Sequence, residues 1–222
     1  MRRHSGLIGL ALMPLAFGAC GSDKITATFT PQQLSDALLT TSDLGTGWTE
    51  TQRDVFTTRQ PENPSIDPSL WCPAGKGGQL ATLAGQEGAD VELGLGATPP
   101  SYMVRQQAWT NADVEQYFTA VTDAVAACSG VTWKDSGDNS YTLQPSTAPE
   151  IGDESISWTV MIQLTGTSPI TTLAQQTVAR FGAVMMVLQD GATPTTGASA
   201  TAPDHLTIVR VAGDKMAALV SP

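Results

Sequence analysis

Histidine is the side chain most often used for acid–base chemistry near neutral pH, and His205 is the one histidine beyond the first 20 residues of this chain. It stands beside the expected start of the last helix, where we interpret it as an exposed polar residue near the helix cap. A His-based triad then has no credible base. One histidine with paired cysteines cannot form a usual zinc site either. The sequence predicts no catalytic residue and no metal ligand.

The short motifs of nucleotide and acyl chemistry are incomplete. Gly94-Leu95-Gly96 lacks the third glycine and the following helix of a dinucleotide site, and residues 75–78 lack the strand and the Lys-Ser/Thr of a P-loop. No Gly-x-Ser-x-Gly elbow occurs. Asp153 and Glu154 are neighbours in an expected strand and point to opposite faces, so they are poorly placed to flank one glycosidic bond. We expect a non-enzymatic protein without a cofactor.

Three side chains are candidates for ligand binding, namely Arg105, Trp109 and Arg180. Both arginines interrupt mild strand patterns, and a half-buried guanidinium needs an acidic partner or an anionic ligand. An Asp or Glu within the fold is the favoured partner. Trp109 and Trp158 could line an apolar pocket, although large aromatic residues in a small domain lie more often in its core. Both alternatives stay open at the level of sequence.

The elements that must position these residues follow from the spacing of apolar side chains. Helices are expected at residues 31–41, at 110–128 and after Thr201 to residue 220; strands are expected at 48–56, 89–96, 102–109, 154–164 and 172–189. We interpret 172–189 as one long strand with a bulge or kink at Gly182, with a helix as the alternative. Three prolines predict a surface loop at 59–70. The order of elements indicates an α+β fold, an antiparallel sheet with helices packed on one face.

The N-terminus predicts export. A basic start precedes an apolar run that is too short to span a membrane, so residues 1–19 are expected to be a signal peptide. Gly18-Ala19-Cys20 after this run resembles a bacterial lipobox, in which the cysteine sulfur receives diacylglycerol. Phe17 stands where a lipobox usually has leucine, and an ordinary signal peptidase is the alternative. Residues 20–29 would then be a flexible tether, and 30–222 a single domain.

Cysteine number and net charge agree with a lipid anchor outside the cytoplasm. The chain has three cysteines, and lipidation of Cys20 leaves Cys72 and Cys128 as one natural disulfide pair in an oxidising compartment. Acidic residues number 21 against 11 basic residues, of which Arg2 and Arg3 lie in the leader. Such a surface repels nucleic acid and anionic lipid headgroups. Membrane attachment must then come from acyl chains.

The order of motifs resembles a known family. The chain is similar to the PknH-like extracellular sensor domains of actinobacteria in the order of five features. These are the segment Leu38 to Thr49, a helix ending at Cys128, the segment Ile151 to Ser155 that opens a strand, a long strand, and a final helix. These domains occur on receptor Ser/Thr kinases and on free-standing lipoproteins. The resemblance implies a twisted antiparallel sheet, helices on one side and a cleft for a small ligand. The kinase domain carries two disulfides, whereas this chain can form one.

These observations predict a lipoprotein on the outer face of the cytoplasmic membrane, whose domain binds a small ligand or acts as a sensor. The ligand would lie between an exposed sheet face and the loop at residues 61–73. The alternative is a structural or partner-docking lipoprotein of the envelope, which would use the sheet face or the acidic surface. A contiguous exposed apolar patch would favour docking.

Overall fold

The computed structural model describes residues 28–57, 71–76, 80, 87–96, 101–110, 113–166, 170–192 and 204–221. The helical elements are α1 (Pro31–Asp36), α2 (Thr41–Leu44), the 3-10 turn η2 (Pro73–Gly75), α4 (Val114–Cys128) and α5 (His205–Val220). The strands are β1 (Trp48–Phe56), β2 (Glu87–Leu95), β3 (Tyr102–Thr110), β4 (Thr132–Lys134), β5 (Ser140–Ser146), β6 (Glu154–Leu164), β7 (Ile170–Phe181) and β8 (Val184–Ala192). The expected signal peptide, Cys20, most of the tether and the loop at 59–70 lie outside the described residues.

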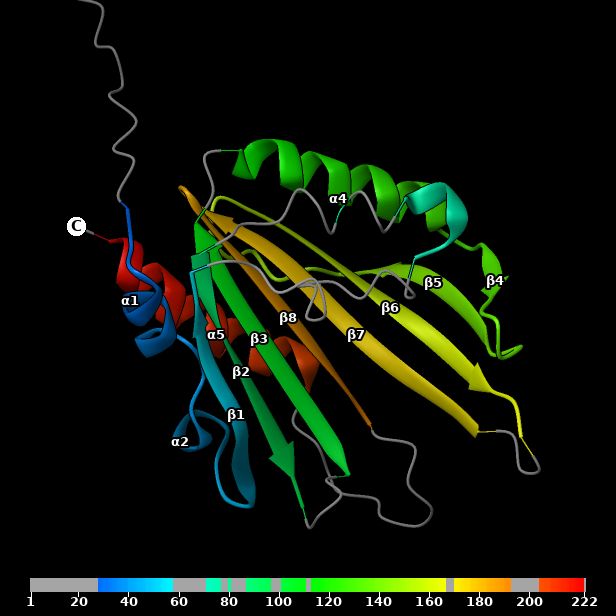
Figure 1. The fold of residues 1–222 in the computed structure, drawn as a ribbon, viewed down its shortest axis with the longest axis horizontal. Helices are drawn as coiled ribbons and strands as arrows, with labels where there is room; N and C mark the ends of the chain where they lie inside the picture. The colour runs from blue at the N-terminus through cyan, green and yellow to red at the C-terminus, as the bar shows by residue number, and fades with distance from the viewer. Residues whose placement is uncertain are drawn as a thin grey trace, which may run out of the picture.

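All eight strands belong to one antiparallel sheet with the order β1-β2-β3-β8-β7-β6-β5-β4. Two meanders, β1 to β3 and β4 to β8, meet where β3 pairs with β8 (Figure 1). The expected α+β class and antiparallel sheet are confirmed, and the strands expected at 48–56 and 154–164 have the expected bounds.

The helices cover both faces of the sheet, which corrects the expectation that they lie on one. Along β8, Val184, Met186 and Leu188 belong to the core beneath α1 and α5, whereas Met185 and Val187 belong to the core beneath α4. Successive side chains of a strand point to opposite faces, so α4 and α5 lie on opposite sides (Figure 1). We call these the α4 face and the α5 face.

The expected strand at 172–189 is instead a hairpin of β7 and β8. Gly182 has a φ of +60° between the two strands, a left-handed conformation that glycine adopts readily. The backbone therefore reverses where a bulge or kink was expected. The register pairs Phe181 with Val184 and continues without interruption to Ala174 and Gly191.

Two helix starts differ from expectation. Thr110 is the last residue of β3 rather than a cap, and Asp113 occupies the N-cap of α4 without a side-chain capping hydrogen bond. Asp204 is the N-cap of α5, while Thr201 lies outside the described residues. The first helix begins as predicted, because Thr30 and Gln33 form a reciprocal capping box with Pro31 at the first helical position.

An ion pair joins the two ends of the domain. Lys215 Nζ on α5 donates to Asp43 Oδ2 on α2 at 2.6 Å, and each side chain is about one quarter exposed. Asp43 also accepts from the backbone N–H and the hydroxyl of Thr40. Burial alone would raise the pKa of Asp43, but the hydrogen bonds from Lys215 and Thr40 outweigh it and hold that pKa below its usual value.

We expect Asp43→Asn to lower the free energy of unfolding at pH 7 by less than about 1 kcal/mol, because the pair is partly solvated. Since the folded-state pKa of Asp43 is depressed, its contribution is present above the unfolded pKa and is lost as pH falls through the folded value. Urea unfolding at several pH values should therefore show the wild type and the variant converging below pH 4. A difference that stays constant into acid would contradict this assignment.

Candidate functional site

Five polar side chains occupy the α4 face over β2, β3, β8 and β7. They alternate with core residues of the α5 face and therefore point to the opposite side. Asp90 lies opposite Gln107, Arg105 lies opposite Gln189, and Gln189 lies opposite Gln176. Directly opposed residues have Cβ atoms roughly 5 Å apart. Asp90, Arg105, Gln107, Gln176 and Gln189 are thus one contiguous group, which we call the sheet-face cluster.

An ion pair lies at the centre of the β2–β3 side of this cluster. Arg105 Nη2 is 3.4 Å from Asp90 Oδ2, and their side chains are 30% and 4% exposed. Burial raises the pKa of Asp90, Arg105 opposes the rise, and Asp54 on β1 adds to it. The Gln107 amide also hydrogen-bonds to the Asp90 carboxyl. The internal partner that the sequence favoured for Arg105 is Asp90.

The cluster also contains buried polar atoms that lack hydrogen-bond partners. Gln107 is 3% exposed and Gln176 is 1% exposed, yet Gln107 Oε1 and both amide atoms of Gln176 bond to nothing in the described part of the chain. The Nε1 atom of Trp158, which lies opposite Gln176, is unpaired as well. Native proteins leave few such groups, because each costs roughly 1–3 kcal/mol. A partner other than the described residues would remove this cost.

Two further indole groups beneath α4 are also buried with an unpaired N–H. Trp71 Nε1 and Trp109 Nε1 are buried without a partner among the described residues. The rings of Trp71 and Trp158 lie 5.2 Å apart at a tilt of 48°, and Trp109 meets Tyr117 of α4 edge to face. Trp109 is 1% exposed and belongs to the core. Of the buried unpaired atoms in the described ranges, only Asp190 Oδ1 lies on the α5 face.

The third sequence candidate, Arg180, is also on the α4 face, at the far end of β7. It forms ion pairs with Asp153 at 3.3 Å and with Glu154 at 2.9 Å. Asp153 Oδ2 additionally accepts from the Gly182 N–H, so Arg180 and its partners fasten the start of β6 to the β7–β8 turn. The structure therefore brings Arg105 into the sheet-face cluster, and it places Trp109 and Arg180 in internal contacts.

On the α5 face, a chain of hydrogen bonds links four buried polar residues. His205 Nδ1 lies 2.9 Å from Asp190 Oδ2, and His205 Nε2 lies 2.9 Å from Thr177 Oγ1. Thr177 Oγ1 lies 2.6 Å from Ser157 Oγ. All four residues are at most 5% exposed. We call Asp190, His205, Thr177 and Ser157 the relay, because its bonds run from β8 through His205 of α5 to β7 and on to β6.

The interpretation of His205 as an exposed residue beside a helix cap is wrong. The imidazole points into the sheet at the first position of α5, where it supplies bonds to both neighbouring strands. Burial raises the pKa of Asp190, while the hydrogen bond and charge of His205 oppose the rise. Burial and the nearby Asp190 carboxyl raise the pKa of Tyr102 as well.

The relay and the sheet-face cluster lie back to back. Gln176 and Thr177 are consecutive on β7, Gln189 and Asp190 are consecutive on β8, and each pair places one side chain on each face. On β6, Ser157 of the relay precedes Trp158 beneath α4. A displacement of β7 or β8 would therefore move both groups together.

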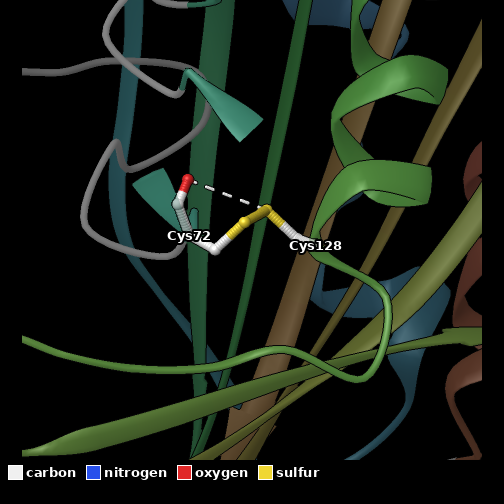
Figure 2. The surroundings of a disulfide bond; sticks show 2 residues. All are labelled: Cys72 and Cys128. Carbon is white, nitrogen blue, oxygen red and sulfur yellow. Dashed lines mark hydrogen bonds between the residues drawn. A yellow bond between two sulfur atoms is a disulfide. The ribbon is translucent and has the colours of Figure 1, made fainter. Parts of the chain in front are cut away.

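The structure joins Cys72 to Cys128, the pair expected from the cysteine count. The bond ties the residue before η2 to the last residue of α4, as Figure 2 shows. Gly75 packs against it so closely that a Cβ at this position would lie 2.5 Å from Cys128 Sγ. The disulfide thereby holds Trp71 over Trp158 and closes one side of the α4 core.

Two classes of site find no support in the described ranges. No three His, Cys, Asp or Glu side chains in this part of the chain are grouped so that they could hold a metal ion. None of the helices within the same ranges has the length and apolar character needed to cross a bilayer.

No protein family and no curated protein matches this sequence. Among solved structures, the chain is similar to the extracellular domain of PknH from Mycobacterium tuberculosis, with a TM-score of 0.57 over 87% of this chain and 97% of that one. The sequence identity is 12%, so the similarity concerns the fold alone. The fold therefore resembles that of this extracellular domain.

Proposed function

We propose that this chain is an extracytoplasmic lipoprotein whose domain binds a small ligand at the sheet-face cluster without catalysing a reaction. The observation that carries the proposal is the set of buried, unpaired amide atoms of Gln107 and Gln176 beside the Arg105–Asp90 pair. These atoms are buried in the described structure, so a molecule that offers donors and acceptors would satisfy them after displacing the groups that cover them. The fold similarity to an extracellular domain supports the compartment.

The lining groups indicate a ligand that is mainly uncharged. Arg105 and Asp90 already neutralise each other, and the unpaired groups are amide and indole atoms, which are neutral. Trp158 adds an apolar surface beside Gln176. A polar, partly apolar molecule such as a sugar, polyol or amide fits these groups.

A catalytic role has little geometric support, although the relay has the spacing of an Asp-His-hydroxyl triad. Thr177, which would be the nucleophile, has no exposed surface and already bonds to Ser157. A substrate could reach it only by displacing α5. The relay therefore favours a role other than acyl transfer.

Partner docking, the rival function, would need a contiguous apolar patch. The large hydrophobic side chains that are exposed in the described ranges are Val55, Val131 and Leu173. Val55 lies on β1 and Leu173 on β7, with three strands between them, and Val131 precedes β4. Scattered single residues of this kind are ordinary surface features.

Replacing Gln176 with leucine tests the ligand site. Without ligand, Gln176→Leu should raise the melting temperature by roughly 2–6 °C, because a buried unpaired amide is replaced by an apolar group of similar size. A thermal-shift panel of sugars, polyols and small amides should contain compounds that stabilise the wild type, since a ligand of the native state raises apparent stability. Those compounds should not stabilise the variant.

Gln175→Leu is the matched control, because Gln175 is the preceding residue on β7 and faces the opposite side. It should keep the ligand-induced shift. Loss of stability in Gln176→Leu without ligand would show that the amide is satisfied within the fold. Equal ligand shifts in the wild type and Gln176→Leu would place the site elsewhere.

The anchor is tested by the intact mass of the protein isolated from membranes. We expect processing at Cys20 and an added mass of acyl chains on its sulfur, together with a mass two hydrogens lower for the Cys72–Cys128 disulfide. Cys20→Ser should release the protein into the soluble fraction, since no basic surface holds it to lipid. Firm membrane attachment of Cys20→Ser would contradict lipid anchoring.

A further inference from the structure

The direction of the relay depends on the protonation of His205. The Nδ1–H donates to Asp190 when the imidazole is neutral, so Nε2 is an acceptor and the Thr177 hydroxyl donates to it. The Thr177 oxygen then accepts from the Ser157 hydroxyl. Every bond of the relay is made, and the chain runs from Ser157 toward Asp190.

Proton uptake on Nε2 reverses the half of the relay beyond the imidazole. An imidazolium donates from both nitrogens, so the bond to Asp190 stays while Nε2–H donates to Thr177. Since Ser157 is the other hydrogen-bond partner of the Thr177 hydroxyl in the described structure, that hydroxyl then donates to Ser157, and the Ser157 hydroxyl turns to a new acceptor. Ser157 is 1% exposed but lies opposite the exposed Ser146 of β5, so the acceptor is most easily found toward that strand.

We propose that Asp190, His205, Thr177 and Ser157 form a proton-operated switch, in which protonation of His205 reverses the two hydroxyls and loosens the first turns of α5. The switch is a regulatory property of the fold, and it does not depend on ligand binding at the sheet-face cluster.

The charged groups around His205 affect how strongly its protonation favours the open arrangement of α5. Asp190 on β8, Tyr102 on β3 and Asp204 at the N-cap of α5 are the titratable groups whose charges act together there. The strands β7 and β6 contribute the uncharged Thr177 and Ser157. The attraction of an imidazolium to Asp190 is offset by its own loss of hydration.

Two features favour the open arrangement after protonation. His205 occupies the first position of α5, where the positive end of the helix dipole disfavours a cation. Its side chain is nearly excluded from water, so the imidazolium regains hydration when the first turns of α5 lift from the sheet. Acid should therefore favour local opening.

The test combines two measurements on the full chain. Histidine ring signals, recorded by NMR from pH 8.5 to 4.5, give the titration of His205, which is identified by the signal missing from His205→Asn. Amide exchange at residues 206–213, corrected for the intrinsic pH dependence of exchange, gives the opening equilibrium of α5. We expect the opening equilibrium constant of α5 to increase by roughly three- to tenfold on acidification, the factor that one net hydrogen bond supplies. The midpoint of this increase should coincide with the midpoint of the His205 titration.

Two serine variants test whether the signal passes through the relay. Ser157→Ala leaves the fully buried Thr177 as the end of the chain, so both midpoints should fall by roughly half to one pH unit. Ser155→Ala is the matched control on the same strand and face; its hydroxyl donates to the Pro149 carbonyl, outside the relay, and both midpoints should stay in place.

Three results would overturn the proposal. His205 could keep one protonation state across the pH range, or α5 opening in the wild type could fail to follow the His205 titration. The pH dependence of opening could also persist in His205→Asn, which would assign it to another group. The first two results are measured on the wild type, and because His4 is the one other histidine of the chain, His4→Gln assigns the two signals even if His205→Asn does not fold.

Discussion

Replacing Cys128 with alanine is expected to lower the free energy of unfolding by about 4 kcal/mol, the loop-closure term for cysteines 56 residues apart. The bond joins two segments far apart in the sequence, and Cys128 is fully buried at the end of α4. Without it, η2 and Trp71 lose their covalent tie to the helix that covers Trp158. Urea unfolding under oxidising conditions measures the loss.

Cys20→Ser is the matched control, because Cys20 precedes the described domain and takes no part in this bond. It should leave the free energy of unfolding unchanged. Treatment of the wild type with a reductant should reproduce the loss seen in Cys128→Ala. A loss below about 1 kcal/mol would mean that the unfolded chain is already restricted without the disulfide.

Replacing His205 with leucine should cost about 3–5 kcal/mol, because it leaves the buried Asp190 carboxyl with the Tyr102 hydroxyl but without its histidine donor. The substitution also removes the acceptor of Thr177. Asp190 is 2% exposed, so water cannot replace the lost hydrogen bond without opening the sheet from α5. Chemical denaturation at pH 7 gives the difference.

A double variant separates the carboxyl from general damage to packing. His205→Leu with Asp190→Leu removes the stranded charge, so it should recover part of the stability that His205→Leu loses. If the double variant is less stable than the single variant by the full cost of a second core substitution, Asp190 is not the source of the loss.

Alternation of apolar and polar residues is visible in the sequence where one face of a strand is buried and the other is wetter, as in β6. β6 alternates apolar and polar residues along its length, and its bounds were predicted from that period. β8 lies between β3 and β7 with α5 on one face and α4 on the other, so Val184 to Leu188 are all buried. Burial on both faces erases the alternation, and the β7–β8 hairpin was therefore missed.

The functional residues were harder to predict because their partners are distant in the sequence. The sequence around His205 shows its position at a helix start and so predicts an exposed residue, whereas its partners are distant, Thr177 by 28 residues and Asp190 by 15. The partner of Arg105 was accessible in principle. The hairpin register of β2 and β3 places Asp90 opposite Gln107, one position along the same face from Arg105.

Nothing in the sequence around the glutamines predicts that they belong to a binding site. Gln107 and Gln176 stand among polar neighbours, and only the three-dimensional structure shows that Gln107 Oε1 and both amide atoms of Gln176 are buried without partners among the described residues. Whether a strand face is covered depends on helices from elsewhere in the chain, and α4 and α5 cover opposite faces here. Their burial follows from the tertiary structure rather than from local pattern.

A high-resolution crystal structure of the protein purified from its native membranes would test the proposed ligand site most directly. The proposal predicts an ordered small molecule within hydrogen-bond distance of the Gln176 amide and of Gln107 Oε1. A structure in which those atoms pair with other groups of the chain, or with isolated waters alone, would contradict a ligand site at the sheet-face cluster.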